Sequence, residues 1–128
     1  MRRYPVRAIF AACVLLAALA AGPVRAAPNP CMSPEVPSVP DGKTAAGREM
    51  IEAANLVRAY IAESDRYQQC LNTWLAGEMS AAVRARKKSD PRLKEEHDRL
   101  GDANQKEKER IGALYNDAQR EFRAAHPR

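Results

Sequence analysis

The sequence predicts an all-α fold, in which two long helices form an antiparallel hairpin and a disulfide ties an extended Pro-rich N-terminal strap to the first helix. Three observations predict it. Pro34, Pro37 and Pro40 recur at every third position, no proline follows until Pro91, and Cys31 and Cys70 can link the Pro-rich segment to the Pro-free one. With 128 residues, 45% of them hydrophobic, the chain has room for one small domain, which excludes a large enzyme core.

Residues 1–26 are predicted to be a secretory signal peptide, cleaved after Ala26. A cluster of arginines precedes 13 apolar residues at positions 9–21, and small residues lie before the cleavage position. The alternative is a retained membrane anchor, but a spanning helix needs about 20 apolar residues. Cys13 lies within the apolar run, whereas a lipidated Cys follows it. We therefore expect a periplasmic or secreted protein whose mature chain has no transmembrane segment.

Loss of the signal peptide removes most of the positive charge. The full chain carries +5, and cleavage removes four of its 21 basic residues but none of its 16 acidic ones, which leaves +1. Nucleic-acid binding requires a concentrated excess of Lys and Arg, and single-strand binding adds aromatic residues along a basic stripe. The mature chain has neither, so no nucleic-acid partner is expected.

The mature chain retains two cysteines, Cys31 and Cys70. An even number of cysteines in an oxidising compartment predicts a disulfide between them. A pair of free thiols and a soft-metal site are the alternatives. A thioredoxin-like redox motif is excluded because the sequence has no C-x-x-C.

Residues 27–43 are predicted to be an extended segment antiparallel to the first helix. A helix from Thr44 places Cys70 about 39 Å along its axis, and the 13 residue steps from Cys31 to Thr44 cover about 40 Å as polyproline II. A flexible linker or a ligand for a Pro-binding module is the alternative. Every third residue would lie on one face, which carries Pro28, Cys31, Pro34, Pro37 and Pro40. A second stripe would carry Val36 and Val39.

The first helix is predicted over residues 44–87. Asp41-Gly42 is typical of a turn, Thr44 is the expected N-cap, and Gly77 marks a point where the helix is expected to bend or fray. Apolar or small residues recur at alternating three- and four-residue steps, which predicts one buried stripe. The stripe consists of Met50, Ala53, Val57, Tyr60, Ser64, Tyr67, Leu71 and Trp74, widened by Ala54, Ile61 and Leu75.

The second helix is predicted over residues 91–125, with Asp90 as N-cap and Pro91 at the first helical position. Its coiled-coil-like stripe has two polar members, Asn104 and Glu107, which indicate a register or partner-choice device or a water-filled gap. The stripe reads Leu93, His97, Leu100, Asn104, Glu107, Ile111, Leu114, Ala118 and Phe122. Folding about residue 89 would place Trp74 near Asn104, Tyr67 near Ile111 and Tyr60 near Ala118.

The sequence contains no recognisable catalytic, cofactor or metal motif, so we expect neither enzymatic activity nor a cofactor. Of the two histidines, His126 is close to the C-terminus. The residues at helical spacing from His97 include Lys94 and Gly101, and neither forms a catalytic pair with it. His97 is therefore interpreted as a structural residue rather than a base or metal ligand. Met32, Met50 and Met79 with Cys31 admit a Cu(I) site, but their scatter favours ordinary packing.

A dense basic group, Arg84, Arg86, Lys87 and Lys88, lies at the predicted tip of the hairpin. Cations at a helix C-terminus offset the helix dipole, which is the simpler interpretation. The functional interpretation is a peripheral contact with an anionic surface of the cell envelope, either lipid or cell-wall polymer.

A two-helix hairpin covers only one side of each helix. We therefore expect the fold to depend on a staple, and its remaining apolar surface to favour self-association. Residues beside the main stripe are candidates for that second contact: Ile51, Ile61 and Leu75.

The stretch from Cys31 to Leu71 has a Cys before a Pro-rich segment, then P-D-G, then Tyr67 followed closely by Cys70. In these features it resembles a family of small exported proteins of Gram-negative bacteria, over about a third of the chain. The resemblance implies a periplasmic location and supports the cysteine pairing, but it brings no activity or catalytic residue. Helical periplasmic stress chaperones are a weaker comparison, since their L-T-x-x-Q signature is absent.

Two functions are consistent with these features. The first is a non-enzymatic protein-interaction module, adaptor or chaperone-like, with a protein partner still to be identified. The second is an envelope-surface binder that acts through the basic group at the tip.

Overall fold

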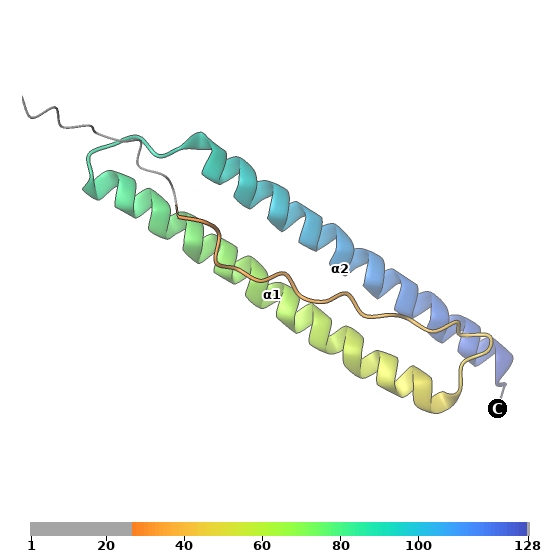
Figure 1. Ribbon diagram of the computed structural model, residues 1–128. Coiled ribbons are helices and arrows are strands. Elements are labelled where there is room, and N and C mark those ends of the chain that lie inside the picture. Colours follow the sequence, from red (N-terminus) through yellow and green to blue (C-terminus); the bar gives the residue numbers. More distant parts are fainter. Residues whose placement is uncertain (1–26, 128) are drawn as a thin grey trace, which may run out of the picture.

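The computed structural model describes residues 27–127, so the predicted signal peptide lies outside the described part of the chain. Two helices, α1 (Gly47–Arg84) and α2 (Pro91–Ala125), run antiparallel over most of their length (Figure 1). An extended strap precedes α1. It runs along the hairpin, antiparallel to α1, as far as the end where α1 begins. The predicted fold class, an all-α hairpin with a disulfide-linked strap, is confirmed.

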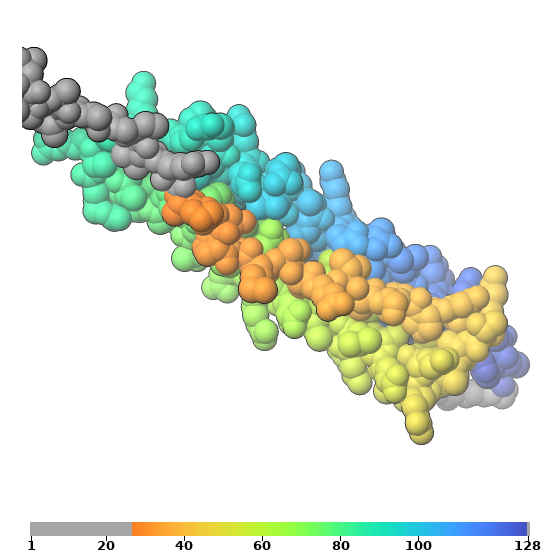
Figure 2. Space-filling model, in the orientation of Figure 1, coloured from red at the N-terminus to blue at the C-terminus, as the bar shows by residue number. Residues whose placement is uncertain are grey.

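The strap lies along the seam between the two helices, where Figure 2 shows it between α1 and α2. Its three-residue period appears in its burial. Cys31, Pro34, Pro37 and Pro40 are half-buried, and the two residues between Cys31 and Pro34 and the two between Pro34 and Pro37 are exposed. The predicted valine stripe forms only in part, because Val36 is 44% exposed whereas Val39 packs against both apolar clusters of the hairpin.

The start of α1 differs from the prediction, because Ala46 rather than Thr44 is the N-cap. The Asp41 carbonyl accepts bonds from the backbone N–H groups of Thr44 and Ala45, and its side chain accepts one from Lys43. These residues therefore form a separate turn. One of the first N–H groups of α1, that of Ala46, donates to the Glu49 carboxylate at 2.7 Å.

The end of α1 is also earlier than predicted, at Arg84 rather than near residue 87. Arg86 adopts a left-handed conformation with φ of 52°, and the following N–H, that of Lys87, bonds to the Ala82 carbonyl. These bonds form a Schellman-type helix end, in which the left-handed position is usually occupied by glycine. The helix continues without interruption through Gly77, so the expected fraying there is wrong.

The start of α2 agrees with the prediction. Asp90 is the N-cap, its side chain accepts the backbone N–H of Arg92 at 3.0 Å, and Pro91 fills the first helical position. The helix ends at Ala125, as expected.

The core follows the predicted stripe on α1 and departs from it on α2. Every predicted stripe residue of α1 from Met50 to Leu71 is buried, and Trp74 is half-buried. On α2, Ile111 and Ala118 are buried but Leu114 is 42% exposed. Tyr115 packs instead against both apolar clusters. Leu114 is the one predicted stripe residue of α2 that is exposed, so the seam shifts to the next residue at that position alone.

The predicted pairing of the helices is wrong by about two helical turns. Ile111 packs against Val57 and Tyr60 rather than Tyr67, and Asn104 donates to the Ser64 carbonyl at 3.3 Å. Residues 87–91 line shallow hollows together with residues of α1 from Leu75 to Ala85. The connection therefore folds back along α1, so α2 begins beside the last turns of α1 rather than opposite its C-terminal end.

Candidate functional site: a stapled strap, a basic tip and an open groove

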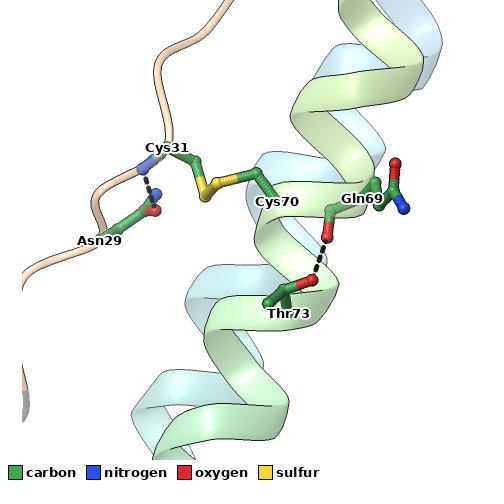
Figure 3. The surroundings of a disulfide bond; sticks show 5 residues. All are labelled: Asn29, Cys31, Gln69, Cys70 and Thr73. Atoms are coloured by element: carbon green, nitrogen blue, oxygen red, sulfur yellow. Dashed lines mark hydrogen bonds between the residues drawn. A yellow bond between two sulfur atoms is a disulfide. The ribbon is translucent and has the colours of Figure 1, made fainter.

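The predicted disulfide is present. Cys31 and Cys70 are bonded, with their Cα atoms 5.8 Å apart, and the link closes a sequence separation of 39 residues. In Figure 3 the side chain of Asn29 turns back to accept the N–H of Cys31, at 2.9 Å, which fixes the strap immediately before the link. On the helical side, the Thr73 hydroxyl donates to the Gln69 carbonyl at 3.0 Å.

The other end of the strap presses against α2. A Cβ atom added to Gly42 would lie 2.0 Å from the Ala118 carbonyl oxygen, so only glycine fits there. Lys43 beside it is 3.7 Å from Glu121 of the same helix. The strap is therefore held on α1 through Cys31 and on α2 through Gly42.

Away from the strap, the middle of the hairpin seam carries polar contacts between the helices. Lys108 donates to Asp65 at 2.7 Å, and Gln68 bonds to Gln105 at 3.3 Å. The third contact joins His97 to Asn72 at 2.7 Å. These contacts cover the middle of the seam on the side that the strap leaves free. An open apolar surface on that side can therefore occur only toward the ends of the hairpin.

His97 is half-buried and both of its ring nitrogens are engaged. Nε2 lies 2.7 Å from Asn72 Oδ1 and Nδ1 lies 2.9 Å from Asp98 Oδ1. Hydrogen bonds from Lys94 and then from His97 lower the pKa of the Asp98 carboxyl. His126 bonds to the Phe122 carbonyl and its ring stacks on Phe122 at 4.3 Å.

The methionines lie apart from one another. Met32 is exposed on the strap, Met50 is buried in an apolar cluster at the start of α1, and Met79 is half exposed near the tip. Within residues 27–127, no group of three or more His, Cys, Asp or Glu side chains is placed to hold a metal.

The four basic residues of the predicted tip are all exposed. Arg84 ends α1, and Lys87 and Lys88 lie where the connection turns back along it. Neighbouring Arg92 and Lys94 are neutralised by Asp90 and Asp98. Among the described residues, none of the four forms an ion pair, whether Arg84, Arg86, Lys87 or Lys88. Two apolar residues of the same helix end, Val83 and Met79, are 75% and 50% exposed.

At the opposite end of the hairpin is an open groove of about 460 Å³ between α1 and α2, here called the terminal groove. Its floor and walls are apolar, and its edges carry Arg58 on α1 and Arg123 on α2. No carboxylate lines it. The apolar residues are Met50, Ile51, Ala54, Tyr115 and Phe122.

The terminal groove and the strap lie on opposite flanks of the seam. Successive helical residues are rotated by about 100°, so Cys70, which holds the strap, and Ile51, in the groove, fall on opposite sides of the buried α1 stripe. No strap residue lines the groove. The strap therefore closes one flank and leaves the other uncovered at this end.

Of the three residues predicted to make a second contact, the structure leaves only Ile51 largely uncovered, at 65% exposure. Ile61 packs against the cluster of Val57, Tyr60 and Ile111, and Leu75 lines a hollow near the tip. The sequence reasoning did not single out Arg58 or Arg123. The position of Arg58, one residue after Val57 of the buried α1 stripe, could have indicated that it borders the seam. That Arg58 and Arg123 lie at the same groove depends on how the two helices pair.

No protein-family model, curated protein or solved structure matches the chain. In the part of the chain that the structure describes, no helix has the length and apolar character needed to cross a membrane. The disulfide and this finding are compatible with an exported protein.

Proposed function

We propose that this protein is an exported, non-enzymatic protein-interaction module of adaptor or chaperone-like type, and that the terminal groove is its binding surface. The observation that carries the proposal is the uncovered apolar groove, in which Ile51 is 65% exposed although Met50, in the same groove, belongs to a buried cluster. Apolar grooves between helices are common docking surfaces for a further helix.

The remaining features support the same proposal. The disulfide and the N-terminal sequence favour export to the periplasm or beyond, as the resemblance to small exported proteins of Gram-negative bacteria also implies. Both histidines are held in hydrogen bonds to other residues of the hairpin. A long hairpin stapled by a strap offers a rigid surface, which reduces the entropy lost on binding.

The proposal is tested by photocrosslinking in the intact cell. A benzophenone amino acid replaces Ile51 in the groove or, as the matched control, exposed Ala113 on α2. We expect a defined protein adduct from position 51 that persists at high salt, because apolar contacts are not screened. The adduct is identified by mass spectrometry and its binding is reconstituted with purified components. Equal labelling from both positions, or no protein adduct, would contradict the proposal.

A second candidate function, an anionic-surface binder, is favoured by the tip. Four cations that have no ion-pair partner within residues 27–127 lie on the same end of α1 as exposed Val83 and Met79, a combination that suits contact with anionic lipid or cell-wall polymer. Substituting Arg84, Lys87 and Lys88 by Gln while keeping Arg86 tests it without disturbing the left-handed turn. Co-sedimentation with anionic vesicles should fall in this variant and at high salt, and unchanged sedimentation would exclude the tip.

A further inference from the structure

The terminal groove has an electrostatic character that its apolar floor does not reveal. Arg58 donates to the neutral side chain of Asn55 at 2.6 Å, and Arg123 donates to the Gln119 carbonyl at 3.3 Å. Neither has a carboxylate partner among residues 27–127. The mature chain as a whole is nearly neutral, so two unneutralised cations around one apolar groove indicate an occupant that is apolar and acidic.

The two arginines lie diagonally across the groove. A Cβ atom added to Gly47 of α1 would be 3.9 Å from the Phe122 ring, which places Arg123 level with the start of α1. The backbone of Arg58 is 11 residues further along α1, about 16 Å at 1.5 Å per residue, and on the other wall. Each side chain turns back along its own helix, to Asn55 and to Gln119, so the two guanidinium groups are closer together than their backbones. A fatty carboxylate carries a single charge at one end. A helix with an apolar face and two carboxylates offers one carboxylate to each arginine.

The chain itself carries such a helical surface. On α1, Glu52, Leu56, Ala59 and Glu63 follow each other at four-, three- and four-residue steps, so they share one face, and all are exposed. Leu56 is 53% exposed. The two glutamates are also 11 residues apart, and neither forms an ion pair within the described chain. We call these four residues the acidic face.

The acidic face lies away from the terminal groove on the same helix. At about 100° per residue, its four residues are turned well away from Ile51 and Arg58, toward the side of α1 that carries Cys70, and they stay exposed beside the strap. Arg48 and Arg66 lie one turn beyond its ends, so it is limited to three turns. One molecule can therefore offer its acidic face to the groove of another while its own groove stays open.

We propose that the terminal groove binds a second copy of this chain through the acidic face. Leu56 and Ala59 of one molecule lie on the apolar floor of the other, and Glu52 and Glu63 pair with Arg58 and Arg123. The contact joins two different surfaces and is therefore heterologous, so it leads to a ring or an open chain of subunits. It covers only three helical turns, and small interfaces of this kind associate weakly. This inference rests on the proposed function, since it names the partner of the same groove.

The experiment uses sedimentation velocity of the full mature protein over a concentration series, with two double variants. Arg58→Glu with Arg123→Glu reverses the groove, and Glu52→Arg with Glu63→Arg reverses the acidic face. We expect wild-type protein to associate reversibly and each variant alone to associate at least about tenfold more weakly, because two ion pairs become repulsions. An equimolar mixture of the two variants should recover association with both variants in equal amounts, because every groove then meets a face of opposite charge. Circular dichroism confirms that both variants fold.

Two further observations distinguish this inference from binding through the basic tip and from binding of a different protein in the groove. The tip variant with Gln at Arg84, Lys87 and Lys88 should associate like wild type, since its charges lie at the other end of the molecule. A wild-type protein that remains monomeric, or a mixture that fails to recover, overturns the inference. If Ile51 then still crosslinks to a different protein in the cell, the proposed function stands and only the identity of the partner changes.

Discussion

At the scale of single residues, Gly42 shows how a turn residue acquires a packing role. Asp41-Gly42 is typical of a turn in sequence, yet no glycine in the described residues has a positive φ. Gly42 is required because its backbone lies against the carbonyl of Ala118, where a Cβ atom would clash at 2.0 Å. The contact fixes how closely the strap approaches α2.

Substitution of Gly42 by Ala should therefore destabilise the protein by about 1–3 kcal/mol, the usual cost of overpacking a well-fitted site. Gly77→Ala is the matched control, because a Cβ atom there meets nothing within 4 Å. In a helix interior that change should stabilise by about 0.5–1 kcal/mol. Urea unfolding measures both. Equal stability of Gly42→Ala and wild type would show that the strap is not closely packed on α2.

Arg86 is the second residue whose backbone matters more than its side chain. It holds the left-handed position that ends α1, with φ of 52°. Because an L-residue with a Cβ atom is disfavoured there, Arg86→Gly should stabilise the fold by about 1 kcal/mol. Arg86→Ala removes the same charge but keeps the Cβ atom, so its free energy of unfolding should stay within about 0.5 kcal/mol of wild type. Equal effects of the two substitutions would assign the change to charge.

At the scale of elements, the strap completes the hairpin on one flank. Val39 contacts both apolar clusters, one at the start of α1 and one around Ile111, and so joins two parts of a thin core. Three half-buried prolines, Pro34, Pro37 and Pro40, lie between the ends that Cys31 and Gly42 hold. Prolines restrict the unfolded chain, which lowers the entropy lost when the strap orders.

Removal of the link by Cys31→Ser with Cys70→Ser should lower the free energy of unfolding by about 2–4 kcal/mol, given the 39-residue separation that the disulfide closes. The strap should become accessible to protease before the helices do, because its remaining contacts are few. Chemical denaturation and limited proteolysis followed by mass spectrometry measure these effects. A strap that stays protected in the double variant would show that packing alone holds it.

At the scale of the whole molecule, three carboxyl groups make folding sensitive to acid. Hydrogen bonds from Arg92, Lys94 and Arg110 lower the pKa values of Asp90, Asp98 and Glu107 below their usual values of 3.8, 3.8 and 4.5. A carboxyl whose pKa is lower in the folded state adds stability above its unfolded pKa. That contribution is lost as the pH falls through the folded pKa.

The melting temperature should consequently fall as the pH drops below about 4.5 and the three groups become protonated. None of the three is buried, so the drop should be modest and smaller still at high salt. Asp90→Asn is a suitable comparison, since Asn also caps helices but does not titrate in this range. We expect a shallower acid dependence in that variant, measured by thermal circular dichroism. A melting temperature that is unchanged at acid pH would contradict this assignment.

The sequence was sufficient for most of the architecture. The hairpin, the disulfide between Cys31 and Cys70, the cap at Asp90 and the buried stripe of α1 all depend on local patterns, and the structure confirms them. The helix pairing was not predictable in the same way. It depends on how the connection after Arg84 turns back, which a left-handed arginine controls and no local propensity announces.

The candidate site divides along the same line. Exposure of Ile51 was predictable, because the residue lies beside a complete apolar stripe. The terminal groove was not, since it exists only where one wall from α1 meets another from α2 at the observed register. Leu114, predicted to be buried, and Tyr115, which is packed in its place, show the same dependence on the partner helix.

The sequence by itself therefore determined which segments are helical, that an extended strap runs antiparallel to α1 and which residues cross-link. Spacing and capping are properties of short stretches of chain, and only two cysteines follow residue 26. Only the tertiary structure decided the register of the helices, the close fit of Gly42 on Ala118 and the meeting of Arg58 with Arg123 across one groove. These are distances between residues far apart in sequence, and packing fixes them through shape rather than through any local pattern.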